Sequence, residues 1–291
     1  MPTATICITT FNRQKILQER ALKSALAQDF SDYEIIVVDH GSTDTTKEAV
    51  EKYIVRKYPV RYIKIPHNSG IVSTARNRGA KEAKGKYLVF LDDDNELHSQ
   101  FLSKTVHALE NAGEDMSAVS SGRIVKHSGY EDYAPPYNDE QFISLDWGWL
   151  IKRKVFDVIQ YDEQMFFNED ADFGLQFTKR FGYMPLNEPL QVAYAHEEGA
   201  SHSFPTLRMI ASMDYFLKKN KEFYQDQPNE LRYLYRLMGR RCYMGGWKKK
   251  GIGYFWKSFL CVKNWKTLKH FLFILLGWRA YNAFMVREEK K

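Results

Sequence analysis

The segment YLVFLDDDNEL, Tyr87–Leu97, places three consecutive aspartates directly behind a run of apolar residues. Adjacent carboxylates repel one another, and an ionised carboxylate beside a hydrophobic core is costly unless positive charge compensates it. Asp92, Asp93 and Asp94 therefore form either a solvated turn or a site for a cation. A hard cation such as Mg²⁺ or Mn²⁺ takes oxygen ligands and commonly bridges carboxylates to substrate phosphates.

Short runs rich in Ile, Val and Tyr alternate with segments of helical periodicity in the first part of the chain. Strands are expected at residues 4–10, 34–39, 60–65 and 87–92, and helices at 14–27, 42–57 and 71–84. This alternation predicts an α/β fold with a mostly parallel sheet and helices on both faces. Ligands bind beyond the carboxyl ends of such strands, where the polar clusters TTFNR, DHGSTD, PHNSG and DDDNE stand.

The pattern changes after His98. A further strand is expected at residues 116–125, a polar loop at 130–141, and a strand running into a helix at 145–159. Another helix is expected to begin near Glu169, with Gly182 as its stop. From Pro205 onward the sequence predicts a helical appendage rich in basic and aromatic residues.

Composition and charge limit the function classes. The 291 residues, 44% of them hydrophobic, suffice for a large domain with an appendage. Three widely spaced cysteines and the absence of a signal-like N-terminus predict a cytoplasmic protein. From Ser203 onward, 19 basic and 6 acidic residues give a charge of +13, against −7 for the preceding part, so different partners are expected for the two.

Four blocks of sequence carry a family resemblance: TICITTFNR, YEIIVVDHGSTDTT, HNSGIVSTARNRGAKEAKGKYLVFLDDDNEL and MFFNEDADFGLQ. In this order they resemble the inverting, nucleotide-sugar-dependent glycosyltransferases of family 2, which have the GT-A fold. The resemblance implies a catalytic domain at residues 1–204 and leaves 205–291 unassigned. It also implies a UDP-sugar donor, a hydroxyl acceptor on a polysaccharide, oligosaccharide or lipid-linked glycan, and Mn²⁺ or Mg²⁺ as cofactor.

The resemblance assigns roles at the nucleotide side of the site. The positions that hold the nucleoside correspond to Thr10, Phe11, Asn12, Arg13 and Asp39, and Arg76 matches a basic residue near the nucleotide. An exposed helix charge is the alternative for Arg76. Asp94 is expected to bind the metal directly, and Asp92 or Asp93 to face the ribose. His40 stands where the family usually has a second acid, so no role follows for it.

The resemblance also assigns the acceptor side. Asp170 is expected to act as the general base, with Glu169 as acceptor ligand or second base; stabilisation of a helix N-terminus is the alternative for both. His196 matches a histidine that joins the metal, His202 is the other candidate, and a merely hydrogen-bonded histidine also explains the pattern. In the segment DWGWL, the acceptor would contact Asp146, Trp147 and Trp149, although core packing explains the tryptophans equally well.

Residues 251–284 interleave aromatic side chains with lysines, which is typical of helices that lie in a membrane interface. The longest apolar run, FLFILLGW, is well short of the roughly 20 residues that span a bilayer. We therefore expect peripheral contact with the inner face of the cell membrane, with packing onto the catalytic domain as the alternative. A non-catalytic membrane-binding adaptor is a second hypothesis. A nicotinamide-dependent oxidoreductase lacks its G-x-G-x-x-G motif here, and no nucleic-acid-binding motif is present.

Overall fold

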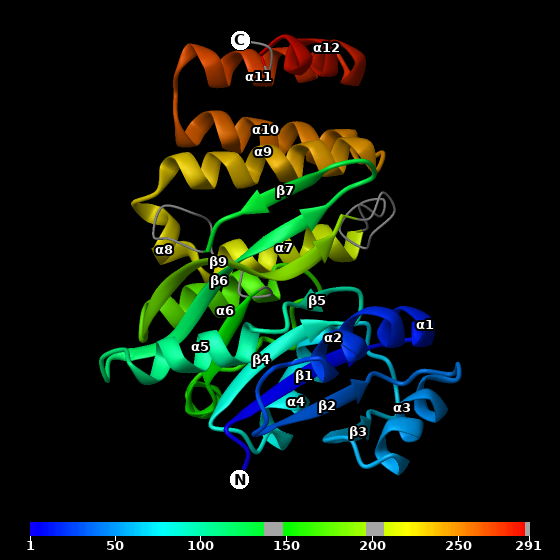
Figure 1. The fold of residues 1–291 in the computed structure, drawn as a ribbon. Coiled ribbons are helices and arrows are strands. Elements are labelled where there is room, and N and C mark those ends of the chain that lie inside the picture. The colour runs from blue at the N-terminus through cyan, green and yellow to red at the C-terminus, as the bar shows by residue number, and fades with distance from the viewer. Residues whose placement is uncertain (137–147, 196–206, 289–291) are drawn as a thin grey trace. The chain divides into compact units, whose positions relative to one another are not determined.

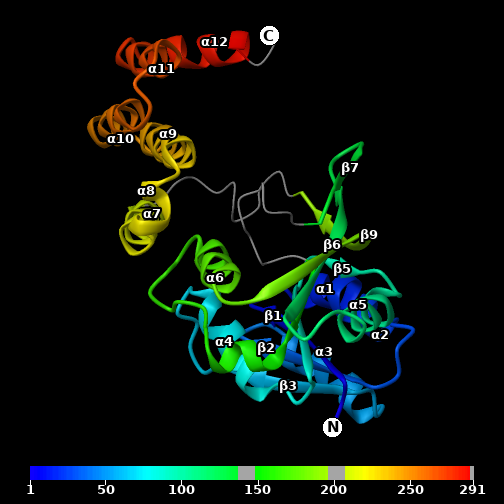
Figure 2. The ribbon, with the colours of Figure 1, turned by 90° about the vertical axis from the view of Figure 1, so that its left-hand side faces the viewer.

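The computed structural model describes residues 1–136, 148–195 and 207–288. The chain divides into two compact units, Met1–Glu197 and Glu198–Lys291, which are described separately below. Figures 1 and 2 show their helices and strands in two views.

The first unit is built on a mixed sheet that has nine strands within the described residues. Its parallel half has the order β3 (Val60–Lys64), β2 (Tyr33–Asp39), β1 (Ala4–Thr10) and β4 (Tyr87–Asp92). Beyond β4 the order continues with β8 (Trp149–Lys152), β6 (Met116–Lys126), β9 (Gly182–Tyr194) and β5 (Glu96–Leu97), and β7 (Glu131–Ala134) pairs with β6. The parallel strands that the sequence predicts are therefore confirmed, within one residue at each end.

The central strands are buried on both faces, which explains why apolar residues follow one another along them without alternating with polar ones. Every residue of β1 is buried, and β4 is buried up to Leu91. Figure 2 shows helices on both sides of this part of the sheet. The flanking elements are α1 (Gln14–Leu17), the π-helical η1 (Gln18–Leu22), α2 (Lys23–Leu26), α3 (Thr46–Val55), α4 (Val72–Glu82) and α5 (Phe101–Glu110).

Helix α4 approaches β1 closely at Gly79. A Cβ atom on Gly79 would lie 2.2 Å from the Sγ of Cys7 and 3.4 Å from the side chain of Val38. Glycine is therefore required for this separation of helix and sheet. The opposite face of β1 presents Ile6 and Ile8 to the apolar residues of α1, η1 and α5.

The structure corrects three expectations for the second half of this unit. Helix α6 (Glu169–Thr178) ends before Gly182, and Gly182 instead begins β9. A Cβ on this residue would lie 2.8 Å from the carbonyl oxygen of Asp115, so glycine permits the close approach of the two segments. The expected polar loop contains β7, a short strand that pairs with β6 and has no regular alternation of apolar and polar residues. The segment after β8 forms the short 3-10 helix η2 (Arg153–Asp157).

The second unit is helical throughout its described residues. Its elements are α7 (Leu207–Lys219), α8 (Lys221–Gln225), α9 (Pro228–Met244), α10 (Lys248–Cys261), α11 (Trp265–Leu275) and α12 (Trp278–Glu288). Helices α9 and α10 pack closely, since a Cβ on Gly239 would lie 2.7 Å from the ring of Phe255. Phe255, Ile274 and Tyr281 form a small core. Over the described residues, none of the helices has the length and apolar character that crossing a membrane requires.

Candidate active site

The strand register brings the predicted nucleotide-side residues to one edge of the sheet. Thr10 at the end of β1 lies opposite Asp39 at the end of β2, and Thr9 lies opposite Asp92 at the end of β4. Because these strands are parallel, the segments that follow them start from the same edge. The aspartate triplet thus lies beside the loop after β1.

Arg13 joins the loop after β1 to the triplet. Its Nη1 donates to Oδ1 of Asp93 at 2.8 Å and to Oδ2 of Asp94 at 2.9 Å. Thr10 Oγ1 donates to the other carboxylate oxygen of Asp93 at 2.7 Å, and Arg20 donates to the carbonyl of Asp94 at 3.1 Å. The side chain of Asp93 is 5% exposed and that of Asp94 15%. Asp93 therefore anchors the turn, and Asp94 lies closer to solvent.

The buried position of Asp93 shifts the pKa of its carboxyl group. Burial raises the pKa of Asp93 to about 7, against the opposing effects of Arg13 and of the hydrogen bond from Thr10. A group with this pKa is only partly ionised at neutral pH. Added positive charge beside it would favour the ionised form.

Arg76 connects the triplet to helix α6. Only 3% of the residue is exposed; its Nη1 donates to Oε1 of Glu169 at 3.1 Å, and its Nη2 donates to Oδ1 of Asp92 at 3.3 Å. Its guanidinium carbon also lies 5.3 Å from the centre of the Tyr161 ring. The alternative of an exposed helix charge is therefore wrong. Two of its hydrogen-bond partners are therefore carboxylates from separate elements of the unit.

Glu169 is the first residue of α6 and follows Asn168, whose φ of 67° turns the chain into the helix. Burial and the adjacent Asp170 raise the pKa of Glu169 to about 7, and Arg76 opposes this rise. Asp172 is fully buried and accepts a hydrogen bond from Gln176 at 2.8 Å, which fits a structural role.

The residues present fit a hard divalent cation. Five carboxylates belong to the triplet and the start of α6, namely Asp92, Asp93, Asp94, Glu169 and Asp170, and Arg13 and Arg76 donate to carboxylate oxygens of this group. The excess of acidic groups and the oxygen donor type both suit Mg²⁺ or Mn²⁺. Among the described residues, no cluster of three or more His, Cys, Asp or Glu side chains forms a metal site by itself.

Asp39 and Asn12 hold the nucleotide-side loops together. Asp39 is 1% exposed and accepts hydrogen bonds from the backbone N–H of Ser42 at 2.7 Å and from the hydroxyl of Tyr62. Asn12, with a φ of 51°, accepts from the N–H of Thr43 at 2.7 Å. Phe11, by contrast, is 38% exposed. The contact to Tyr62 was not predicted, because nothing in a strand sequence marks which hydroxyl will meet a carboxylate on the neighbouring strand.

His40 connects the loops after β2 and β3. Its Nε2 accepts from the N–H of Ser69 at 3.3 Å and lies 3.2 Å from the Ser69 hydroxyl. Burial lowers the pKa of His40, although Asp39 opposes this effect. His40, at the position where the family usually has a second acid, thus links the loop after β2 to the loop after β3.

The acceptor-side predictions have different outcomes. Asp146, Trp147, His196 and the alternative His202 lie outside the described residues. Trp149 is 3% exposed, and its ring lies 5.9 Å from that of Phe177 and 5.2 Å from that of Tyr183, measured between centroids. The expectation that Trp149 stacks on an acceptor is therefore wrong, and core packing explains this residue.

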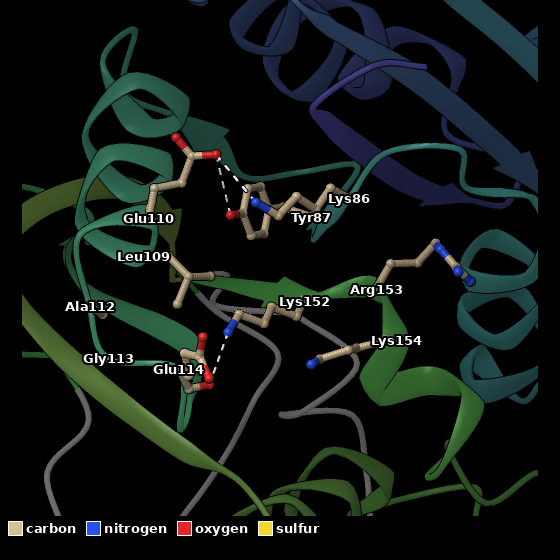
Figure 3. Close-up of a pocket in the computed structure, with 10 residues that line it drawn as sticks. All are labelled: Lys86, Tyr87, Leu109, Glu110, Ala112, Gly113, Glu114, Lys152, Arg153 and Lys154. Atoms are coloured by element: carbon tan, nitrogen blue, oxygen red, sulfur yellow. Dashed lines mark hydrogen bonds and ion pairs between the residues drawn. The ribbon is translucent and has the colours of Figure 1, made fainter.

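A cavity of about 610 Å³ lies away from the aspartate triplet (Figure 3). It is lined by Lys86, Tyr87, Glu110, Lys152 and Lys154, among others. Tyr87 is the first residue of β4, whereas Asp92 is the last, so the cavity and the triplet lie at opposite ends of the strand. Figure 3 shows Lys86 directed toward Glu110 and Lys152 directed toward Glu114.

Comparisons with known proteins show the family and the fold. The family model "Glycosyl transferase family 2" matches residues 5–167. The uncharacterized glycosyltransferase EpsJ of Bacillus subtilis is 28% identical over 75% of this chain and 67% of its own length. The GalNAc(5)-diNAcBac-PP-undecaprenol beta-1,3-glucosyltransferase of Campylobacter jejuni is 35% identical over 44% of this chain. The chain spans only 40% of that relative's length.

Two solved structures share the fold. Residues 1–349 of Staphylococcus aureus TarS, in complex with UDP-GlcNAc, match with a TM-score of 0.65 and 17% identity, over 90% of this chain and 82% of that one. The mannosyltransferase PcManGT of Pyrobaculum calidifontis, in complex with GDP-Man and Mn²⁺, gives 0.62 and 15%, over 98% and 83%. The predicted GT-A fold is thereby confirmed. Because the family model matches more than half of the chain, including the aspartate triplet, the protein belongs to glycosyl transferase family 2.

Proposed function

We propose that the protein transfers a sugar from a UDP-sugar to a hydroxyl group of a glycan or a lipid-linked glycan, with inversion at the anomeric carbon. One observation carries the proposal: Arg76 joins Asp92 of the triplet to Glu169 of α6 in a single buried network. The network thus links an acidic group that we assign to the donor side with one that we assign to the acceptor side. The UDP-GlcNAc bound by TarS and the lipid-linked acceptor named for the Campylobacter relative support these substrate classes.

On the donor side, Asp94 with Asp92 would hold a divalent cation, and the Mn²⁺ in the PcManGT complex supports this cofactor. The cation, when bound, compensates charge on the leaving diphosphate. Arg13 bonds to both Asp93 and Asp94 and so fixes the turn that presents them. We expect the exposed ring of Phe11 and the carboxylate of Asp39 to lie against the nucleoside.

On the acceptor side, we assign Asp170 as the general base. The acceptor hydroxyl must lose its proton as its oxygen attacks the anomeric carbon, and a carboxylate oxygen can take it. Glu169 is ion-paired to Arg76 and has a pKa of about 7, so it orients the acceptor or serves as the second base. Inversion follows from a single displacement in which base and leaving group lie on opposite sides of the sugar.

A panel of UDP-sugars, each incubated with Mn²⁺ or Mg²⁺ and a glycan acceptor, tests this function. We expect transfer from at least one donor that depends on the cation, and a product whose anomeric configuration by NMR is opposite to that of the donor. Transfer that is undiminished by a chelator would exclude the role of the cation. A product with the donor's configuration would exclude inversion.

We further propose that the second unit contacts an anionic membrane, where a lipid-linked acceptor would lie. Large apolar side chains of α10, α11 and the residue after α11 are exposed: Trp256, Leu260, Trp265, Leu272, Leu275 and Leu276. Their exposed fractions run from 44% for Trp256 to 75% for Leu276. Lys269 lies 5.9 Å from the Trp265 ring. Aromatic and basic residues in combination suit the boundary between headgroups and acyl chains.

Vesicle co-sedimentation tests the membrane contact. We expect the full chain to bind vesicles of phosphatidylcholine with phosphatidylglycerol at low salt. The variant Trp265→Ser with Leu275→Ser and Leu276→Ser should lose most of this binding. Val158→Ser, at a residue of the first unit that is 64% exposed, is the matched control and should bind like the wild type. Equal binding by all three proteins would exclude this surface.

A further inference from the structure

A cluster of cations lies where α9 meets α11 in the second unit. Arg232, Arg236 and Arg240 are four residues apart along α9, so their side chains project from one face of that helix. Lys266 and His270 have the same spacing on α11. Nη1 of Arg236 lies 3.4 Å from Nε2 of His270, so side chains from the two helices meet at this point.

The four cations of this cluster have no acidic partner among the described residues. Within the part of the chain that the structure describes, Arg232, Arg236, Arg240 and Lys266 make no ion pair, whereas Lys250 of the same unit pairs with Asp214 at 3.4 Å. The Nε of Arg232 is buried and has no hydrogen-bond partner. Like charges four residues apart on a helix destabilise it. An anion bound between these side chains would therefore offset their mutual repulsion.

The positive charges of the cluster also affect the protonation of His270. Burial and the charges of Arg236, Lys266, Arg232 and Arg240 lower the pKa of His270 to about 4. The imidazole is therefore neutral at physiological pH. Its Nδ1 lies 3.3 Å from the hydroxyl of Tyr281. The positive charge of the cluster thus resides on the arginines and Lys266 alone.

We propose that Arg232, Arg236, Arg240 and Lys266 form a binding site for a phosphate or diphosphate group. Guanidinium groups match phosphate oxygens with paired N–H donors, and a lysine adds a point charge. The group could belong to a lipid headgroup or to a soluble molecule, since both present the same oxygens. The site is distinct from the carboxylate network of the first unit and does not rest on the proposed transfer reaction.

Isothermal titration of the full chain with inorganic diphosphate, in the presence of EDTA, tests the site. The chelator removes the cation through which the carboxylate network would hold a diphosphate. We expect the variant Arg236→Gln with Arg240→Gln to bind diphosphate at least tenfold more weakly than the wild type. Arg279→Gln, at an exposed arginine of α12, is the matched control and should bind as the wild type does.

A second variant and a second probe complete the test. Lys266→Gln changes an exposed side chain, so it should fold normally and still weaken binding several-fold. Vesicles of phosphatidylcholine with phosphatidic acid distinguish a lipid headgroup from a soluble molecule as the ligand. If the arginine and lysine variants lose binding to these vesicles, and the wild type binds free diphosphate only weakly, the ligand is a headgroup. Binding that the arginine and lysine variants leave unchanged in both assays would overturn the proposal.

Discussion

The guanidinium of Arg76 donates a hydrogen bond to Glu169 across 93 positions of sequence, with a distance of 3.1 Å and side-chain exposures of 4% and 13%. The same guanidinium bonds to Asp92 at 3.3 Å. Arg76 is therefore a positioning residue that fixes the start of α6 relative to the end of β4. Its positive charge also keeps the pKa of Glu169 lower than burial and Asp170 alone would set it.

Arg76→Gln should change both stability and pH dependence. Removing one partner of a buried ion pair costs about 3 to 5 kcal/mol, so the free energy of unfolding at pH 7 should fall by an amount of that order. The pKa of Glu169 should rise above about 7, and the acidic limb of the activity profile should move to higher pH. Urea denaturation and a pH–rate profile measure these effects. An unchanged profile in a folded variant would exclude an influence of Arg76 on the acidic groups of the site.

Asp94→Ala should weaken the binding of UDP only when a divalent cation is present. Asp94 is the more exposed of the two aspartates that bond to Arg13, and its oxygens are suited to a hard cation. Isothermal titration with Mn²⁺ and with a chelator measures the difference for wild type and variant. If the variant and the wild type bind UDP equally well with Mn²⁺, Asp94 is not a ligand.

Asp170→Asn should reduce turnover by about 100-fold or more, the usual scale for loss of a general base. The amide retains the shape of the side chain, so folding and donor binding should be normal. Asp157→Asn, in the exposed part of η2, is the control for the same chemical change. Near-normal turnover of the Asp170 variant would remove this residue from the mechanism.

Stability in the presence of a chelator should fall as the pH rises from about 4 to about 7. Burial raises the pKa of Asp93 and of Glu169 to about 7, well above their values of 3.8 and 4.5 in an unfolded chain. At these two carboxyls the folded state binds more protons than the unfolded state in this range, so raising the pH favours unfolding. His270, whose pKa is lowered from 6.5 to about 4, acts in the opposite direction, but the two carboxyls together outweigh this single group. Melting temperatures across this range measure the trend. Mn²⁺ with UDP should reduce it, because added positive charge favours the ionised carboxylates.

Gly79→Ala should destabilise the first unit, although alanine is the better helix former. The new methyl group would lie 2.2 Å from the Sγ of Cys7, and overpacking of a core typically costs about 1 to 3 kcal/mol. Gly253→Ala in α10 is the matched control, because open space surrounds that position; it should stabilise its helix by up to about 1 kcal/mol. Urea denaturation measures both. Equal effects at the two glycines would contradict the close approach of α4 to β1.

The sequence by itself predicts the parallel half of the sheet. The apolar runs of β1, β2 and β4 are long and bounded by polar residues, and strands buried on both faces need little more than such a run to be recognised. The order of the polar clusters along the chain, together with the parallel arrangement, then places Thr10, Asp39 and Asp92 at one edge. This part of the candidate site follows from local pattern alone.

Tertiary structure alone decides which charges meet. No periodicity relates Arg76 to Glu169 or Arg236 to His270, because each pair forms only when separate helices pack. The same holds for Trp149, whose burial depends on Phe177 and Tyr183, and for Gly182, which allows β9 to approach the residue before β6. A sequence records which side chains can ionise or stack. Their burial and their partners, which determine pKa and role, depend on contacts between segments distant in the chain.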